Sequence, residues 1–348
     1  MLQLNLGGVA TISPIINDNE AARGGGEIFT MSADKEASEA EGRNAYCAAC
    51  GIAEIDNIVL NECNHCKSVR YCGVKCQKEH RPWHKEECKK RAAELRDELL
   101  FKQPESSCYG DCPICCLPLS LDTRKATLFS CCSKVICDGC DYANQIREFE
   151  GSLQPKCLFC RLPRTSLSQK IELNLMRRVE AEDPVARSQM GEIHYDKGDY
   201  DEAFQCWEKA AEMGNALAHF SLCNMYREGK GVKKDEKKMV YHLEQAAIAG
   251  VPDARYNLGL VEEEHGRMDR AVQHWIIAAN QGHDHSLRTL KDCYREGSVN
   301  KEDFAAALRA HQAAVDATKS PQREAIDVFI CKKWGSRQAF FRRGGLKC

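Results

Sequence analysis

The chain has no apolar run of the roughly 20 residues that a membrane-spanning helix needs, so no membrane association is expected. Its first residues, MLQLNLGGVATISPII, lack the basic start and the long apolar core of a signal peptide. Cysteine is scarce outside one region, because only five of the 22 cysteines lie beyond residues 47–160. The clustered cysteines have the spacing of metal ligands, which predicts a reducing compartment, the cytoplasm or the nucleus.

A strong excess of one charge is also lacking, since 49 Lys and Arg are balanced by 51 Asp and Glu. A basic run does extend from Lys67 to Arg91, but no aromatic platform for stacking bases accompanies it. Metal-bound cysteines are thiolates, so we interpret this run as a solvated helix face that offsets their negative charge. No nucleic-acid partner is therefore expected.

The first cysteine-rich segment, residues 47–88, offers eight zinc ligands in four pairs. The pairs are Cys47 and Cys50, Cys63 and Cys66, Cys72 and Cys76, and His84 and Cys88. Zinc takes four ligands in a tetrahedron, and two cysteines separated by two residues supply half of one site. Ligands four residues apart share a helix face, so short helices are expected from 72 to 88. Apolar residues are too few for a core, so metal binding must supply much of the folding energy.

This segment resembles the MYND finger family. The matching strings are CAAC (47–50), CNHCKSVRYC (63–72) and CQKEHRPWHKEEC (76–88). The resemblance implies two interleaved sites, one formed by Cys47, Cys50, Cys72 and Cys76 and the other by Cys63, Cys66, His84 and Cys88. His65 and His80 are left over, and we interpret them as solvated or as neighbours of the ligands. The Trp that usually follows the position of His80 is replaced by Arg81, and Trp83 comes two residues later.

A second cysteine-rich segment, residues 112–160, also offers eight ligands. They are Cys112 and Cys115, Cys131 and Cys132, Cys137 and Cys140, and Cys157 and Cys160. The segment resembles a RING-type cross-brace in the strings CPIC (112–115), FSCCSKVICDGC (129–140) and CLFCR (157–161). The resemblance implies one zinc on Cys112, Cys115, Cys137 and Cys140, and another on Cys157, Cys160 and the cysteines at 131 and 132.

The second of these RING-like sites departs from the family pattern. Lys134 stands where a RING usually has a zinc-binding histidine. Either Cys131 and Cys132 both bind zinc, or the site is three-coordinate or absent. Cys108 and Cys116 lie close enough in the sequence to substitute, and are otherwise free thiols.

Two residues bear on ubiquitin-ligase activity. RING ligases contact the conjugating enzyme through an apolar residue in the first CxxC, here Ile114, and many contact ubiquitin through an arginine after the last cysteine, here Arg161. Lys134 and the missing proline between Cys157 and Cys160 count against this activity. The opposing interpretation is a RING-like fold that only docks or braces.

From about residue 183 a period of 32 to 36 residues replaces the cysteine pairs. A pair of alanines followed by a glycine recurs as Ala210–Ala211 with Gly214, Ala246–Ala247 with Gly250 and Ala278–Ala279 with Gly282, and Ala313–Ala314 follows without the glycine. Each unit predicts two helices, and the first helices span 186–198, 218–231, 254–266 and 286–297. Each glycine suits a left-handed helix end. This periodicity is typical of an α-solenoid.

The units resemble Sel1-like repeats, which are related to tetratricopeptide repeats, most clearly in YREGKGVKKDEKKMVYHLEQAAIAG (226–250). The resemblance implies a groove that binds other proteins. A large apolar residue precedes each alanine pair, and we interpret the aromatic ones as core between repeats. These residues are Trp207, Leu243, Trp275 and Leu308. Cys206, Cys223 and Cys293 are interpreted as small core residues.

The predicted fold is mainly α, with two small cross-braced zinc modules followed by an α-solenoid of helix-turn-helix repeats. The expected segments are a disordered start (1–43), a MYND-type finger (44–91), a helical linker (92–107), a RING-like module (108–164), a connecting helix (165–182), the Sel1-like solenoid (183–318) and a C-terminal cap with a basic tail (319–348).

These features predict a zinc-binding adaptor that binds proteins or short peptides through its finger and its solenoid. About four zinc ions are expected, two in the finger and one or two in the second module. Protein ligands fill each site, which excludes catalytic zinc. The alternative is a RING-type ubiquitin ligase without a covalent intermediate. In that case the second module recruits a ubiquitin-conjugating enzyme (E2), and the solenoid or the finger holds the substrate.

Overall fold

The structure, a computed structural model, describes residues 46–55 and 58–329. These residues form two compact units, one ending at Lys102 and the other beginning at Gln103. The expectations for 1–43 and for the basic tail beyond 329 fall outside the described residues. Among the described residues, no helix is long and apolar enough to cross a membrane.

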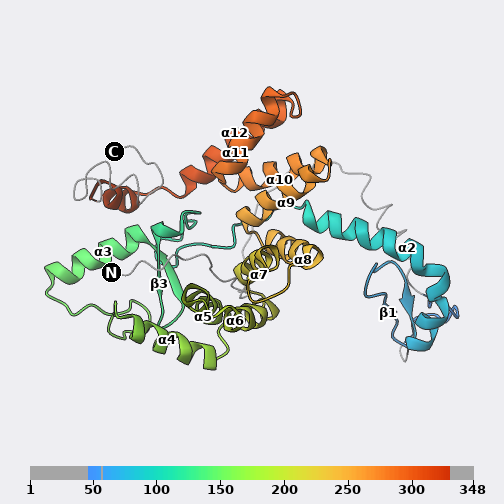
Figure 1. Cartoon of the computed structure of the whole chain (residues 1–348), viewed down its shortest axis with the longest axis horizontal. Helices are drawn as coiled ribbons and strands as arrows, with labels where there is room; N and C mark the ends of the chain where they lie inside the picture. The colour runs from blue at the N-terminus through green and yellow to red at the C-terminus, as the bar shows by residue number, and fades with distance from the viewer. Residues whose placement is uncertain (1–45, 56–57, 330–348) are drawn as a thin grey trace, which may run out of the picture. The chain divides into compact units, whose positions relative to one another are not determined.

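The first unit consists of a small hairpin and one long helix (Figure 1). Strands β1 (Asn61–Glu62) and β2 (Arg70–Tyr71) pair antiparallel, with Asn61 opposite Tyr71. Helix α2 (Val74–Leu100) follows directly. Most residues in the buried cluster of the hairpin region are cysteines. The cluster consists of Cys47, Leu60, Cys63, Cys66 and Tyr71. Such a core is too small to hold the fold without another source of stability.

Helix α2 differs from the short helices and the separate linker helix that the sequence suggested. It runs without interruption through Pro82 and through the expected boundary at 91/92. A proline inside a helix removes one backbone hydrogen bond and usually breaks the helix. Here ligand groups hold the helix on both sides of that proline, at Cys76 and at His84. Beyond the ligands, Arg91 pairs with Glu94 and Glu98 along the exposed surface, which favours continuation of the helix.

The second unit begins with a hairpin and a helix that carry the second set of cysteines. Strands β3 (Ala126–Phe129) and β4 (Lys134–Cys137) pair antiparallel, and the helix α3 (Asp138–Glu150) follows β4 at once. A single 3-10 turn, η1 (Thr123–Lys125), precedes β3. Arg164 pairs with the buried carboxylate of Asp141 at 2.9 Å and lies over the ring of Phe129, and so ties the segment after α3 to the hairpin.

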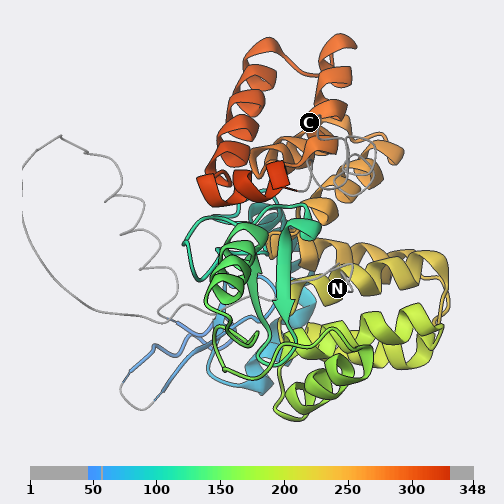
Figure 2. The same ribbon diagram turned by 90° about the vertical axis from the view of Figure 1, so that its left-hand side faces the viewer.

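Helix α4 (Ser168–Glu180) connects this module to a stack of helical pairs. Its Ile171 and Leu175 pack against Ala186 and Met190 of the first helix of the stack. The helices of the stack are α5 (Pro184–Lys197), α6 (Tyr200–Glu212), α7 (Ala216–Glu228), α8 (Glu236–Ile248), α9 (Pro252–Glu264), α10 (Met268–Asn280), α11 (Asp284–Arg295) and α12 (Lys301–Ala317). Each helix contacts the next in order, which is the arrangement of an α-solenoid (Figures 1 and 2).

Tryptophans lock the helical pairs through close contact with glycine. The fully buried Trp275 lies directly on Gly259 of the preceding helix, and its indole N–H donates to the carbonyl of Tyr256 at 3.3 Å. Trp207 lies on Gly191 in the same way. The absence of a side chain on each glycine is what admits the indole ring. Both tryptophans are therefore core residues, as the sequence predicted.

The second repeat has a different pair of residues at the same places. Leu243 replaces the tryptophan and Cys223 replaces the glycine, and both are buried. Gly191, Cys223 and Gly259 are each the eighth residue of their helix. Where the first helix of a repeat has glycine, the second has tryptophan, and where the first has cysteine, the second has the smaller leucine. The combined volume of the two side chains therefore stays similar from repeat to repeat.

The turns between repeats confirm the role expected of the glycines. Gly214, Gly250 and Gly282 have φ values of 84°, 84° and 90°, the left-handed conformation that ends a helix. The fourth pair, α11 and α12, departs from the pattern. Its Leu308 is 47% exposed, whereas the corresponding residues of the other repeats are buried. No further repeat packs on that face of α12 among the described residues.

Candidate metal centres

The structure brings the sixteen predicted ligands together in four groups of four. Within each group, the sulfur atoms and the histidine nitrogen all lie within 4.8 Å of one another. The groups are Cys47, Cys50, Cys72 and Cys76; Cys63, Cys66, His84 and Cys88; Cys112, Cys115, Cys137 and Cys140; and Cys131, Cys132, Cys157 and Cys160. In each module, the pairs alternate along the chain between the two groups. Two sites therefore brace one another in each module.

Four of the cysteine pairs adopt one backbone form, which explains why they converge. In each of these four CxxC pairs the residue after the second cysteine has a positive φ, and its N–H donates to the carbonyl of the first cysteine; the fifth pair, Cys137 and Cys140, leads into α3 instead. These residues and their donor–acceptor distances are Gly51 (2.9 Å), Lys67 (3.0 Å), Cys116 (2.8 Å) and Arg161 (3.1 Å). The resulting tight turn directs backbone N–H groups at the sulfur, as between Phe159 and Cys157 at 3.5 Å.

In the first unit, α2 supplies one ligand of the first group, Cys76, and two ligands of the second, His84 and Cys88. Cys76 lies in its first turn beside Cys72, with 3.5 Å between their sulfur atoms. Two turns later, the Nε2 atom of the buried His84 lies 3.2 Å from the sulfur of Cys66. One turn further, Cys88 lies 3.7 Å from Cys63. His84 and Cys88 thus share a face of α2, as the sequence predicted, whereas Cys72 lies before the start of the helix.

The two histidines left over from the first module lie outside both groups. His65 is exposed. His80 accepts or donates a hydrogen bond at 3.1 Å to the hydroxyl of Tyr71 and stacks on the ring of the ligand His84. Burial and the neighbouring thiolates raise the pKa of Tyr71 to about 12, so its hydroxyl stays protonated. His80 and Tyr71 therefore hold the ring of His84 in place.

In the second module, the adjacent cysteines both point into one group. Cys131 lies 3.3 Å from Cys160, and Cys132 lies 3.6 Å from Cys157, measured between sulfur atoms. A tight turn allows this, because the N–H groups of Cys132 and Ser133 both bond to the carbonyl of Phe129. Lys134 is exposed on β4 and lies in neither group.

The two cysteines considered as substitutes lie elsewhere. Cys108 is buried, and its N–H bonds to the carbonyl of Gly250 in the solenoid at 2.9 Å. Cys116 is exposed at the positive-φ position of its turn. Neither belongs to a four-ligand group among the described residues.

The pKa values of the thiols in the first module bear on whether its two groups bind a cation. Burial opposes ionisation, yet backbone N–H groups lower the pKa values of Cys47 and Cys63 to about 6. Other thiols of the same groups have pKa values raised to about 12. Hydrogen bonding to Cys72 is the main cause for Cys76, and burial is the main cause for Cys88. Because neighbouring thiolates repel one another, four of them need a cation between them. Four sulfurs, or three sulfurs and an imidazole, suit Zn²⁺.

The residues singled out for ligase activity are both accessible. Ile114 is 45% exposed in the first turn of the second module. Arg161 is exposed at the positive-φ position of the last turn. The backbone form of these turns accounts for the position of Arg161, since Gly51 and Lys67 stand at the same place in the first module.

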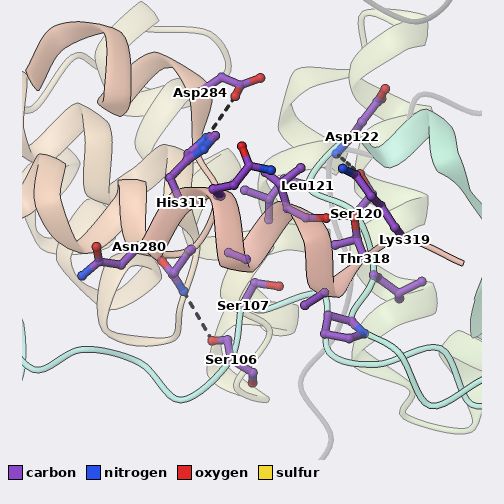
Figure 3. A pocket seen from close by; sticks show the side chains of 18 of the residues that line it. Ser106, Ser107, Ser120, Leu121, Asp122, Asn280, Asp284, His311, Thr318 and Lys319 are labelled. Carbon is purple, nitrogen blue, oxygen red and sulfur yellow. Dashed lines mark hydrogen bonds and ion pairs between the residues drawn. The ribbon is translucent and has the colours of Figure 1, made fainter. Parts of the chain in front are cut away.

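A cleft of ≈ 1070 Å³ that the sequence did not predict lies between the second module and the end of the solenoid (Figure 3). Its walls come from residues 103–107, the loop 118–122, and helices α11 and α12. Asp284 of α11 faces His311 of α12, and the Oδ1 atom of Asp284 lies 3.0 Å from the Nε2 atom of His311. The segment before the module is fixed to the solenoid, since Gln281 donates to the carbonyl of Ser106 at 3.4 Å.

A second feature missed by sequence reasoning is Arg323, which lies 208 positions after Cys115 and donates to its sulfur at 3.4 Å. Neither the cleft nor this contact leaves a local signal in the sequence. Both arise from segments that only the fold brings together.

Two families match parts of the chain. Residues 47–88 match the MYND finger family, and residues 185–215, 216–251 and 252–283 match the Sel1 repeat family. The predictions of a MYND finger, of Sel1-type repeats and of a mainly α fold with cysteine-rich modules before a solenoid are confirmed. The RING resemblance stays a prediction, and so does a fourth repeat.

Among individual proteins, the chain is similar to two curated relatives named DAP3-binding cell death enhancer 1. The rat protein is 24% identical over 213 residues, which are 50% of this chain and 40% of the relative. The mouse protein is 25% identical over 177 residues, which are 39% of this chain and 35% of the relative. The chain therefore spans less than half the length of the curated relatives it matches.

Two solved structures share similarity with parts of the chain. A Sel1 repeat protein from Oxalobacter formigenes is 32% identical and covers 34% of this chain and 96% of its own, with a TM-score of 0.32. The protective antigen c5321 of uropathogenic Escherichia coli is 22% identical and covers 48% of this chain and 37% of its own, with a TM-score of 0.35.

Proposed function

We propose that this protein is an interaction adaptor in which zinc holds the two cysteine-rich modules and the second unit binds a partner protein. The cleft between the second module and α11–α12 carries this proposal. Its volume of ≈ 1070 Å³ lies at the upper end of the range for small-molecule pockets. Most of the residues that line it are polar or charged, as suits an extended peptide. The distribution of cysteines supports a cytoplasmic or nuclear location.

DAP3 is the partner that we propose, because the curated relatives are named for binding it. The zinc-loaded full chain is expected to bind purified DAP3 in a calorimetric titration. Reversing two charges in the cleft, Asp284→Lys with Arg288→Glu, is expected to weaken binding at least about tenfold, which corresponds to about 1.4 kcal/mol. The double substitution leaves the net charge unchanged.

A matched control lies on the same helix. Asp292 and Arg295 pair at 2.9 Å near the end of α11 and do not line the cleft. The swap Asp292→Lys with Arg295→Glu should leave affinity within about twofold. Trp83→Ala, at a residue 83% exposed on α2, tests whether the finger contributes. No binding of DAP3 by the wild-type chain would overturn the proposed partner, and equal losses in both swaps would overturn the cleft as its site.

Ubiquitin ligation is the second candidate, supported by the cross-braced groups of the second module and by the exposure of Ile114 and Arg161. Such an enzyme positions a thioester for attack by an amine. If it operates here, the chain accelerates discharge of ubiquitin from a loaded E2, and Ile114→Ala and Arg161→Ala each abolish the acceleration while zinc content is retained. A zinc-loaded chain that accelerates no E2 in a broad panel is an adaptor only.

A further inference from the structure

The last described helix, residues 321–329, packs on the second module beside α3 (Figure 1). Three contacts hold it there. The rings of Tyr142 and Phe329 lie 5.1 Å apart, and Lys125 pairs with Asp327 at 3.4 Å. The backbone of Arg323 is so close to Gly139 that a side-chain carbon on this glycine would lie 2.7 Å from the Arg323 nitrogen. The helix and the module therefore form one packed contact.

Arg323 is the buried centre of this contact, with only 8% of its surface exposed. Its guanidinium donates to the carbonyls of Pro118 and Thr318 at 2.7 Å each, and to that of Leu117 at 3.2 Å. A further N–H reaches the sulfur of Cys115 at 3.4 Å. The planar, multi-donor head of arginine is what permits four acceptors at once.

Among the described residues, the one negatively charged group in direct contact with the guanidinium of Arg323 is the cysteine group. Its carbonyl partners are neutral, and the described residues contain no carboxylate paired with it. A buried guanidinium without a counter-charge is costly. A zinc ion with four thiolates leaves about two negative charges in the group of Cys112, Cys115, Cys137 and Cys140. This group and Arg323 therefore offset each other.

We propose that Arg323 is part of the first metal centre of the second module, as an outer residue that holds Cys115 and neutralises the thiolates. Metal binding and docking of residues 321–329 are then linked, so that each stabilises the other. Glu324 and Asp327 of the same helix line the cleft, so the metal centre also supports one of its walls. This link between the metal centre and the helix does not depend on DAP3 being the partner.

The test measures zinc release from the full chain to a chromogenic chelator. Arg323→Met, which keeps the length and removes the charge, is expected to speed release of one ion about 10- to 100-fold, the usual effect of an outer-shell substitution on metal affinity. The phase that disappears in Cys140→Ser identifies the ion of this centre. Lys319→Met is the matched control, since it removes a charge near the same helix from a side chain that pairs with Asp316.

The reciprocal measurement is hydrogen exchange at residues 321–329. Cys140→Ser is expected to abolish protection there while α5–α10 stay protected. If Arg323→Met fails to fold, Phe329→Ala loosens the helix without touching Cys115 and should still speed release from the same centre. Equal release rates in the arginine variant and the lysine control would overturn the proposal, and so would unchanged exchange in the zinc-deficient variant.

Discussion

Replacing either Cys131 or Cys132 with serine is expected to remove one zinc ion from the protein. Both sulfurs lie with those of Cys157 and Cys160 within 4.8 Å, so each adjacent cysteine can supply one ligand. A serine hydroxyl does not ionise near neutral pH and is a poor ligand for zinc. Structural zinc contributes about 10 kcal/mol or more to the folding of small domains, so losing a ligand should cost several kcal/mol.

Native mass spectrometry of the full chain measures the result directly. The wild type should carry about four ions, and each single variant about three. Cys116→Ser is the matched control, because Cys116 is an exposed cysteine of the same module outside both groups. A full complement of zinc in both serine variants would show that the adjacent cysteines are not ligands. A wild type with three ions would show that this site does not form.

Gly259→Ala is expected to destabilise the solenoid by about 1–2 kcal/mol. In most helices this substitution is favourable by about 0.5–1 kcal/mol, because alanine restricts the unfolded chain. Here the added methyl group would lie 2.6 Å from a carbon of the Trp275 ring, which is fully buried and has no room to move. Overpacking of this kind typically costs 1–3 kcal/mol.

A double-mutant cycle isolates the cause. Trp275→Leu alone leaves a cavity and should also destabilise, by about 2–4 kcal/mol. Combined with Gly259→Ala, it places a small side chain opposite a leucine, as Cys223 lies opposite Leu243 in the second repeat. The double variant should therefore lose less stability than the sum of the two single losses. Urea unfolding followed by helical circular dichroism provides the free energies. Glu263→Ala, at an exposed site of the same helix, should change stability by less than about 0.5 kcal/mol. Strict additivity in the cycle would rule out the contact as the source.

The residues that could be predicted from the sequence are those whose partners are near in the chain or repeat at a fixed interval. CxxC pairs define half a site within four residues, and positions such as His84 and Cys88 share a helix face by geometry alone. The alanine pairs and glycines recur at the repeat interval, so the helical pairs and the left-handed turns at Gly214 and Gly250 followed. The pairing of the half-sites came from family resemblance and not from local spacing.

The errors and omissions have physical causes. The dense spacing of ligands from 72 to 88 suggested short helices, but α2 runs unbroken through Pro82, with ligand groups on both sides of that proline. Lys134 stands where a RING usually has a zinc-binding histidine, which left the ligand role of Cys131 and Cys132 open. The turn at Phe129 instead presents two adjacent sulfurs. Leu308 is exposed because, among the described residues, no further repeat packs on its face of α12, and its sequence context does not reveal this.

By itself the sequence determined the two cysteine-rich modules, the helical repeats and their order, because spacing and period are local properties of the chain. Only the tertiary structure decided which groups meet across long distances. The cleft is closed by residues 103–107 against α11 and α12, and Arg323 reaches Cys115 from 208 positions away. Contacts of this kind depend on how the second module packs against the end of the solenoid, and no periodicity or spacing in the chain encodes that packing.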